Sequence, residues 1–211
     1  STSSDISVFV EAKANSIEFL IPELTSFLSD LNVNLEVILS EHWFVPSGDL
    51  LTFNDCITKD RPNLDLGAVI SSGKDTDYIS GHFILTRDGA VSSTKTIDTE
   101  NSVSLLIRQN DNMAWLQARS LDVTKGAVAQ TELIMESIEA AIKPLNLSFK
   151  DIVKSTTHYV GGDTAEELHQ NMEVRNAYYE KPGPASTGLA VFGISDNASR
   201  IVIDLTLLKE K

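Results

Sequence analysis

The chain has few side chains that could perform chemistry near neutral pH, namely four histidines and one cysteine. His42, His82 and His169 show no metal-ligand spacing with one another or with carboxylates, so the sequence predicts no local metal motif. Cys56 lies in a polar crossover without a strong activating group, which argues against a catalytic thiol. We therefore expect a site with neither a metal nor a cofactor.

His158 lies in the middle of a predicted strand, on the face that it shares with Ile152, Lys154 and Thr156. Its imidazole could act as an acid or a base near neutral pH. It could equally be a hydrogen-bonded structural histidine, which is the interpretation that we favour.

Arg175 lies on a helical stripe that is unusual for a solvated charge. The stripe also contains Ala165, Leu168, Met172 and Tyr179. Arg175 could hold the carboxylate of a ligand in a pocket. It could also be a snorkelling or intersubunit salt-bridge arginine, and we favour this second role.

Hydrophobic periodicity and turn residues divide the chain into helices and strands. In the first half they predict a helix over residues 7–31 and strands over 35–45, 66–71 and 78–86, separated by a polar crossover. In the second half they predict strands over 104–109, 113–118, 152–160, 188–194 and 200–208, with helices over 130–142 and 163–179. Residues 92–101 have the composition of a connector.

The two halves show a possible internal repeat. The segment Glu36–Ser40 parallels Asp151–Ser155, and each follows a Ser-Ile-Glu triplet. Both halves also run helix, strand, polar crossover, strand, strand. A duplication explains this shared order, and two unrelated αβ segments are the alternative.

Composition disfavours several classes of partner. The 211 residues contain 17 basic and 30 acidic side chains, giving a net charge of -13 that disfavours nucleic acid and anionic membranes. One cysteine excludes an internal disulfide framework. There is no apolar run of membrane-spanning length and no signal-peptide pattern at the first residues. We therefore expect a cytoplasmic protein.

Several short segments after about Thr96 occur in the order of one known family. They are Thr99-Glu100-Asn101, Ala129-Gln130-Thr131 at a helix start, Asp151 to Thr156 at a strand start, Asn171 with Tyr178 and Tyr179, Pro184-Ala185, and Ile201 to Asp204. In these segments the chain resembles the reactive-intermediate deaminase superfamily, the Rid or YjgF proteins.

The resemblance implies an α+β fold of the chorismate-mutase-like type, in which a sheet is backed by helices. Such proteins assemble as trimers with ligand pockets in clefts between subunits, so we expect a homotrimer that binds a small carboxylate metabolite. On this basis, residues 95–211 form a full copy of the fold. Residues 1–94 form a degenerate copy that lacks its leading strands.

Family deaminases hydrolyse enamines and imines, and they hold the substrate carboxylate with an arginine directly after Pro-Ala. In this chain Ser186 follows Pro184-Ala185, and Gln117-Ala118 stands where the family has Ser-Gly. A short neutral serine cannot replace a bidentate cation. A deaminase would need Arg119 or Arg175 in that role, although Arg119 could also be an exposed strand-end charge.

The segment Pro184 to Gly188 is also similar to a step in chorismatases, tandem Rid-fold enzymes that hydrolyse the enolpyruvyl ether of chorismate. Ser186 and Thr187 could donate hydroxyls to a ligand or satisfy backbone groups. We expect hydrolase or lyase chemistry on a cyclic or enol-type acid. An imine deaminase with a relocated arginine and a non-catalytic binding trimer are the alternatives. The predicted ligand-binding residues are Gln117, Arg119, His158, Arg175, Ser186 and Thr187.

Overall fold

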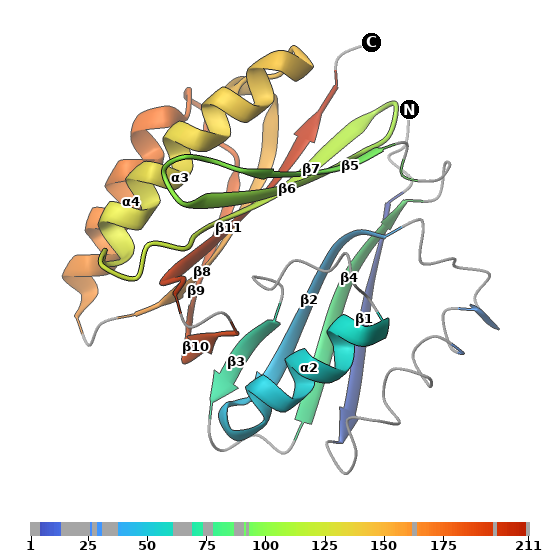
Figure 1. The fold of residues 1–211 in the computed structure, drawn as a ribbon. Helices are drawn as coiled ribbons and strands as arrows, with labels where there is room; N and C mark the ends of the chain where they lie inside the picture. The colour runs from blue at the N-terminus through green and yellow to red at the C-terminus, as the bar shows by residue number, and fades with distance from the viewer. Residues whose placement is uncertain are drawn as a thin grey trace.

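Two β-sheets with helices on their outer faces make up the molecule (Figure 1). The computed structural model describes residues 5–13, 26, 29–30, 38–60, 69–73, 78–86, 91, 93–161, 164–195 and 198–209. The mixture of helices and sheets is the α+β class that the sequence predicts.

The six-stranded sheet has the strand order β5-β6-β7-β11-β8-β9. Its strands are β5 Ser93–Asp98, β6 Val103–Gln109, β7 Met113–Ser120, β8 Ile152–Val160, β9 Ala185–Val191 and β11 Ile201–Leu208. Helices α3 (Ala127–Ile142) and α4 (Ala165–Tyr178) lie side by side across one face, as Figure 1 shows. Short 3-10 turns at Lys143–Leu145 and Phe149–Asp151 connect α3 to β8. Neighbouring strands are antiparallel except β8 and β9, which are parallel.

The five-stranded sheet has the order β1-β4-β2-β3-β10. Its strands are β1 Asp5–Lys13, β2 Ile38–Pro46, β3 Val69–Gly73, β4 Tyr78–Thr86 and β10 Gly193–Ile194. A 3-10 turn at Ser47–Asp49 leads into helix α2 (Leu50–Asp60). Phe53 of α2 packs against Trp43 of β2, with ring centroids 5.2 Å apart. This contact fixes which face of the sheet the helix covers.

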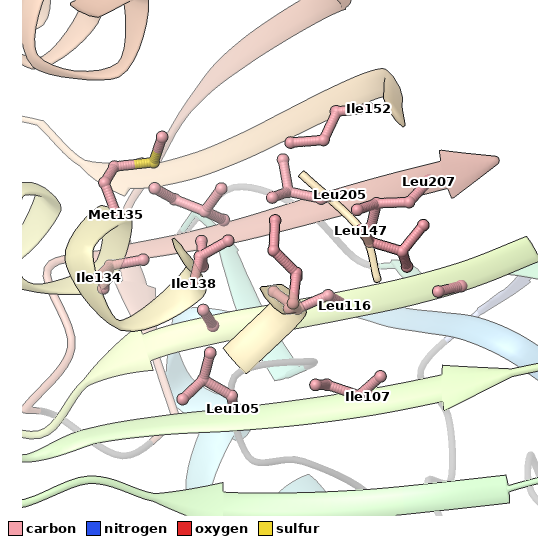
Figure 2. Packing of buried hydrophobic residues seen from close by; sticks show 14 of the residues in the cluster. Leu105, Ile107, Leu116, Ile134, Met135, Ile138, Leu147, Ile152, Leu205 and Leu207 are labelled. Carbon is pink, nitrogen blue, oxygen red and sulfur yellow. The ribbon is translucent and has the colours of Figure 1, made fainter. Parts of the chain in front are cut away.

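The main hydrophobic core lies between the six-stranded sheet and α3 (Figure 2). Alternate residues of β6, β7 and β11 face the helix because side chains of a strand point to opposite faces in turn. Leu105, Leu116 and Leu205 are such residues, and they meet Ile134 and Ile138 of α3. The opposite set of side chains from the same strands faces the five-stranded sheet.

Both sheets contain the same four-strand unit, β7-β11-β8-β9 in one and β1-β4-β2-β3 in the other. In each unit the first two pairings are antiparallel and the last is parallel. The two sheets thus repeat one strand arrangement. Strand β1 adds a leading strand to the first sheet, and the division of the chain into a degenerate copy and a full copy stays a prediction.

A shared β-bulge aligns the two copies residue by residue. The extra residue of the bulge is Val153 in β8 and Leu39 in β2. The flanking pairs are Lys154 with Thr206 and Ile152 with Leu207 in one copy, and Ser40 with Ile84 and Ile38 with Leu85 in the other. Bulges re-aim the residues beside them. Ile152 therefore joins the helix-side core and does not share a face with His158, contrary to the sequence-based expectation.

In the first sheet His42 pairs with His82, and in the second Thr156 pairs with Asp204 at the same distance from the bulge. The alignment therefore places His42 at the position of Thr156, and His82 at the position of Asp204. The sequence comparison matched Ser40 with Ser155, whereas the bulge matches Ser40 with Lys154. A shift of one residue exchanges the two faces of a strand. The register implied by the sequence comparison was therefore wrong.

Contacts between the two sheets join the copies within the chain. The short strand β10, which follows β9 of the second copy, pairs with β3 of the first sheet. Leu39 of the first copy packs against Leu106 and Trp115 of the second. The inner faces of the two sheets are thereby brought together.

Several elements differ from the sequence-based expectations. Residues 7–13 belong to strand β1, and most of the remaining helix expected over 7–31 lies outside the described residues. The crossover after Pro46 contains helix α2, and the expected connector over 92–101 contains strand β5. Strand β5 begins at Ser93, and the boundary at residue 95 stays a prediction. None of the helices that the structure describes is long and apolar enough to cross a membrane.

We expect Leu116→Ala to lower the free energy of unfolding by about 2–5 kcal/mol, because it opens a cavity in the core between β7 and α3. Leu208→Ala is the matched control, since Leu208 is 44% exposed and its replacement should cost less than about 1 kcal/mol. Urea denaturation of both variants gives the two values. Equal losses would contradict this description of the core.

Candidate ligand-binding pocket

A pocket of about 240 Å³ lies between the inner faces of the two sheets. Strands β2 and β4 of the first copy form one wall, and β7, β8, β9 and β11 of the second copy form the other. Its lining residues are Ser40, His42, Phe44, His82, Ile84, Trp115, Lys154, Thr156, His158, Thr187, Leu189, Asp204 and Thr206. The pocket therefore needs both copies of one chain.

Two histidines meet one carboxylate in the wall of this pocket. Asp204 of β11 lies with its Oδ2 atom 3.2 Å from Nε2 of His42 and 3.6 Å from Nδ1 of His158. The two imidazole centroids are 4.9 Å apart. All three side chains are almost completely buried. We call these three residues the His-Asp-His cluster.

Gln117 fixes the orientation of the central carboxylate. It lies opposite Asp204 in the β7–β11 ladder, and its Nε2 donates a hydrogen bond of 2.9 Å to Oδ1 of Asp204. Oδ2 is thereby left facing the two histidines. Oδ2 of Asp204 and Nδ1 of His158 have no hydrogen-bond partner among the described residues. These two buried polar atoms are consequently close together but do not form a hydrogen bond with each other.

Burial and mutual interaction set the charges in the pocket. Burial is the largest influence on the pKa of Asp204 and would raise it, but His42 and His158 together outweigh burial and hold this pKa well below its usual range. Burial lowers the pKa of His158, although Asp204 opposes that change. Burial, followed by repulsion from His42, Lys154 and His158, lowers the pKa of His82 to about 4. At neutral pH the pocket therefore contains the ionised carboxylate of Asp204 and the neutral imidazoles of His158 and His82.

The remaining lining is partly apolar and partly hydroxylic. Trp115 lies edge-on to His42, and Phe44 lies edge-on to His158, so each imidazole is held against an aromatic ring. Lys154 adds an ammonium group to the same pocket. A ligand with an apolar body and an acidic group would match these surfaces.

Three of the predicted ligand-binding residues belong to this site or touch it. His158 and Thr187 line the pocket, and Gln117 contacts Asp204. Ser186 follows the alternation of β9 and points to the opposite side from Thr187. Ligand binding by any of these residues stays a prediction.

The two predicted arginines do not line the pocket. Arg175 lies on the helix side of the sheet, where its Nε donates to Asn171 (3.0 Å) and its Nη1 donates to Thr157 (2.8 Å). Asn171 in turn donates to Thr131 of α3. Arg119 is buried on the inner face, two ladder steps beyond Gln117. The geometry gives Arg175 a structural environment between α4, α3 and β8.

Sequence reasoning missed three principal members of the site. His42, His82 and Asp204 lie on three strands that are far apart in the chain, so no local spacing relates them. Only the registers of β2–β4 and β8–β11 bring them into one cavity. A correctly aligned repeat would have indicated that His82 and Asp204 occupy equivalent positions.

We expect Arg175→Met to lower the free energy of unfolding by about 2–3 kcal/mol, because Asn171 and Thr157 lose a charged donor in a buried site. Arg200→Met is the control, since Arg200 is exposed. Chemical denaturation measures both. A variant with unchanged stability but impaired ligand binding would instead place Arg175 in ligand recognition.

Comparison with known proteins gives similarities of structure. The crystal structure of a chorismatase matches 98% of this chain and 75% of its own, with a TM-score of 0.60 and 11% sequence identity. A RidA from the Antarctic bacterium Psychrobacter matches 56% of this chain and 89% of its own (TM-score 0.39, 18% identity). The match to a YjgF family member from Neisseria meningitidis covers 56% of this chain and 97% of that protein's chain (TM-score 0.44, 12% identity).

No family model and no curated protein matches the chain. At such low identity the similarities define the fold and not the chemistry. The match to chorismatase extends over both copies, whereas those to RidA and the YjgF protein extend over about half of the chain. The chain therefore has a fold similar to that of a chorismatase over almost its whole length.

Proposed function

We propose that the chain binds a small carboxylate metabolite in the pocket between its two sheets and cleaves an enol-type bond in it. The observation that carries this proposal is the His-Asp-His cluster in a cavity that also holds Lys154 and apolar walls. A cytoplasmic location belongs to the same proposal.

The composition of the pocket supports an acidic ligand. Lys154 can pair with a carboxylate, and the hydroxyls of Thr156 and Thr187 can donate hydrogen bonds to it. Trp115 and Leu189 offer apolar surface to the rest of the molecule. A cavity of about 240 Å³ suits a metabolite with a single ring.

The cluster supplies groups for the proton transfers that this chemistry needs. Hydrolysis of an enol ether adds a proton to the terminal methylene carbon and a water molecule to the carbon that bears the ether oxygen. The resulting hemiketal breaks its C–O bond to give a keto acid and an alcohol, so the net change is the addition of one water. His158 would transfer the proton and His42 would orient the water, with Asp204 balancing the charge. The similarity to chorismatase suggests chorismate as the first compound to test.

The two alternatives from the sequence make different demands on the site. An imine deaminase would need a cation for the substrate carboxylate, and the cation in this pocket is Lys154 rather than Arg119 or Arg175. A non-catalytic binding protein would use the same pocket without turnover. Turnover therefore distinguishes the proposal from a non-catalytic binding protein, and the identity of the product distinguishes it from an imine deaminase.

We expect chorismate to bind the protein and to release pyruvate, and Lys154→Met to weaken binding by about tenfold through loss of one charged contact. Isothermal titration measures the dissociation constant, and a coupled assay measures pyruvate. Lys150→Met is the matched control, because Lys150 is exposed and lies outside the pocket. His158→Gln should retain binding and lose turnover.

The proposal would be contradicted if chorismate did not bind and no pyruvate were released at high enzyme concentration. Binding without pyruvate, with wild-type behaviour of His158→Gln, would favour the non-catalytic alternative. Ammonia release from an imine such as 2-aminoacrylate, without activity on chorismate, would favour the deaminase.

We also propose that the chain forms a homotrimer, as the family resemblance implies. The outer strand β9 and the residue that follows it expose apolar side chains, with Leu189 43% and Phe192 72% exposed. Such surface on a sheet edge favours association with another copy.

We expect light scattering to give three times the 23.1 kDa mass of one chain, and Phe192→Asp to reduce it toward the mass of one chain. Val123→Asp is the control, because Val123 is 73% exposed away from this strand. A monomeric wild type would overturn the trimer.

A further inference from the structure

We propose that the His-Asp-His cluster binds one divalent transition-metal ion, with Zn²⁺ as the metal that best suits its ligands. The inference goes beyond the proposed function, since the ion would bind whether or not a carboxylate metabolite does. It rests on the identity, spacing and burial of His42, His158 and Asp204.

The types of side chain fit such a metal. Two imidazoles and one carboxylate are the ligands of many catalytic zinc sites, and other first-row metals bind the same combination. One nitrogen of each histidine and one oxygen of Asp204 all lie within 4.8 Å of one another. The three side chains come from three different strands of two sheets, which makes their convergence a tertiary feature rather than a surface accumulation of acidic groups.

The spacing fits as well. Zinc bonds to nitrogen and to carboxylate oxygen are about 2.0–2.2 Å long, so two ligand atoms at the tetrahedral angle lie about 3.3–3.5 Å apart. Oδ2 of Asp204 is 3.2 Å from Nε2 of His42 and 3.6 Å from Nδ1 of His158. The histidine nitrogens lie within 4.8 Å of each other, so a single ion could contact all three atoms once the two imidazoles move closer together.

Two buried atoms of the cluster form no hydrogen bond, which supports an ion bound between them. Oδ2 of Asp204 and Nδ1 of His158 are buried, and neither forms a hydrogen bond with any of the described residues. A buried polar atom without a partner is costly. One ion among these atoms would satisfy both of them and would compensate the buried carboxylate.

Gln117 supplies the support that a ligating carboxylate usually has. Its Nε2 donates to Oδ1 of Asp204 at 2.9 Å, which turns Oδ2 toward the histidines. All three side chains that would bind the ion line the pocket, so a fourth coordination position would face the bound metabolite. A divalent ion beside one carboxylate leaves net positive charge there, which also suits an acidic metabolite. The ion would then act on that metabolite as a Lewis acid.

Titration of chelator-treated protein with ZnCl₂ tests the proposal. We expect one equivalent of Zn²⁺ to bind with a dissociation constant in the micromolar range or below, and to raise the melting temperature. Asp204→Asn and His158→Gln should each weaken Zn²⁺ binding by at least tenfold. His169→Gln, on the exposed face of α4, should leave it unchanged.

Crystals soaked in ZnCl₂ provide a second measurement that needs no variant. An anomalous difference peak between His42, His158 and Asp204 supports the proposal even if a variant fails to fold. The proposal is overturned by the absence of both binding heat and a peak, by a peak elsewhere, or by loss of binding in His169→Gln alone.

The zinc and chorismate experiments fail independently. Zinc binding without any effect of chorismate supports the metal site and removes the proposed function. Chorismate cleavage by chelator-treated protein that binds no zinc supports direct proton transfer by the cluster and removes the metal site.

Discussion

The structure depends on the burial of one carboxylate between two sheets. Asp204 belongs to the second copy, yet its Oδ2 atom faces His42 of the first copy as well as His158 of its own. An ionised carboxylate in such a position is costly unless positive or polar groups surround it. The packing of the two copies and the chemistry of the pocket are therefore coupled through the same three side chains.

Duplication accounts for the framework, and divergence accounts for the site. The bulge at Leu39 and Val153 shows that the two copies keep one backbone register. Within that register the side chains differ, since His42 takes the place of Thr156 and His82 takes the place of Asp204. Equivalent positions of two copies thus face each other across one cavity with different chemical groups, which gives a single asymmetric site instead of two identical ones.

Local patterns predicted the second copy well, because its branched and apolar runs are bounded by Pro, Gly, Asn and Asp residues. Strand β8 was predicted over 152–160, as observed. Strand β1 was missed because the helical pattern of the following residues was extended back over it, and α2 was missed because polar residues obscure the spacing of Leu50, Phe53 and Ile57. The site was not predictable in this way, since the contacts of Asp204 depend on the register between strands and on the docking of two sheets.

The short strand β10 has a consequence for folding. It is encoded near the end of the second copy but completes the sheet of the first, through Gly193 opposite Ser71 and Ile194 opposite Ile70. The first copy can acquire its last strand only after almost the whole chain has been synthesised, and the second copy cannot detach without removing that strand. Truncation of the chain before β10 would therefore remove a strand from the first sheet as well as the end of the second.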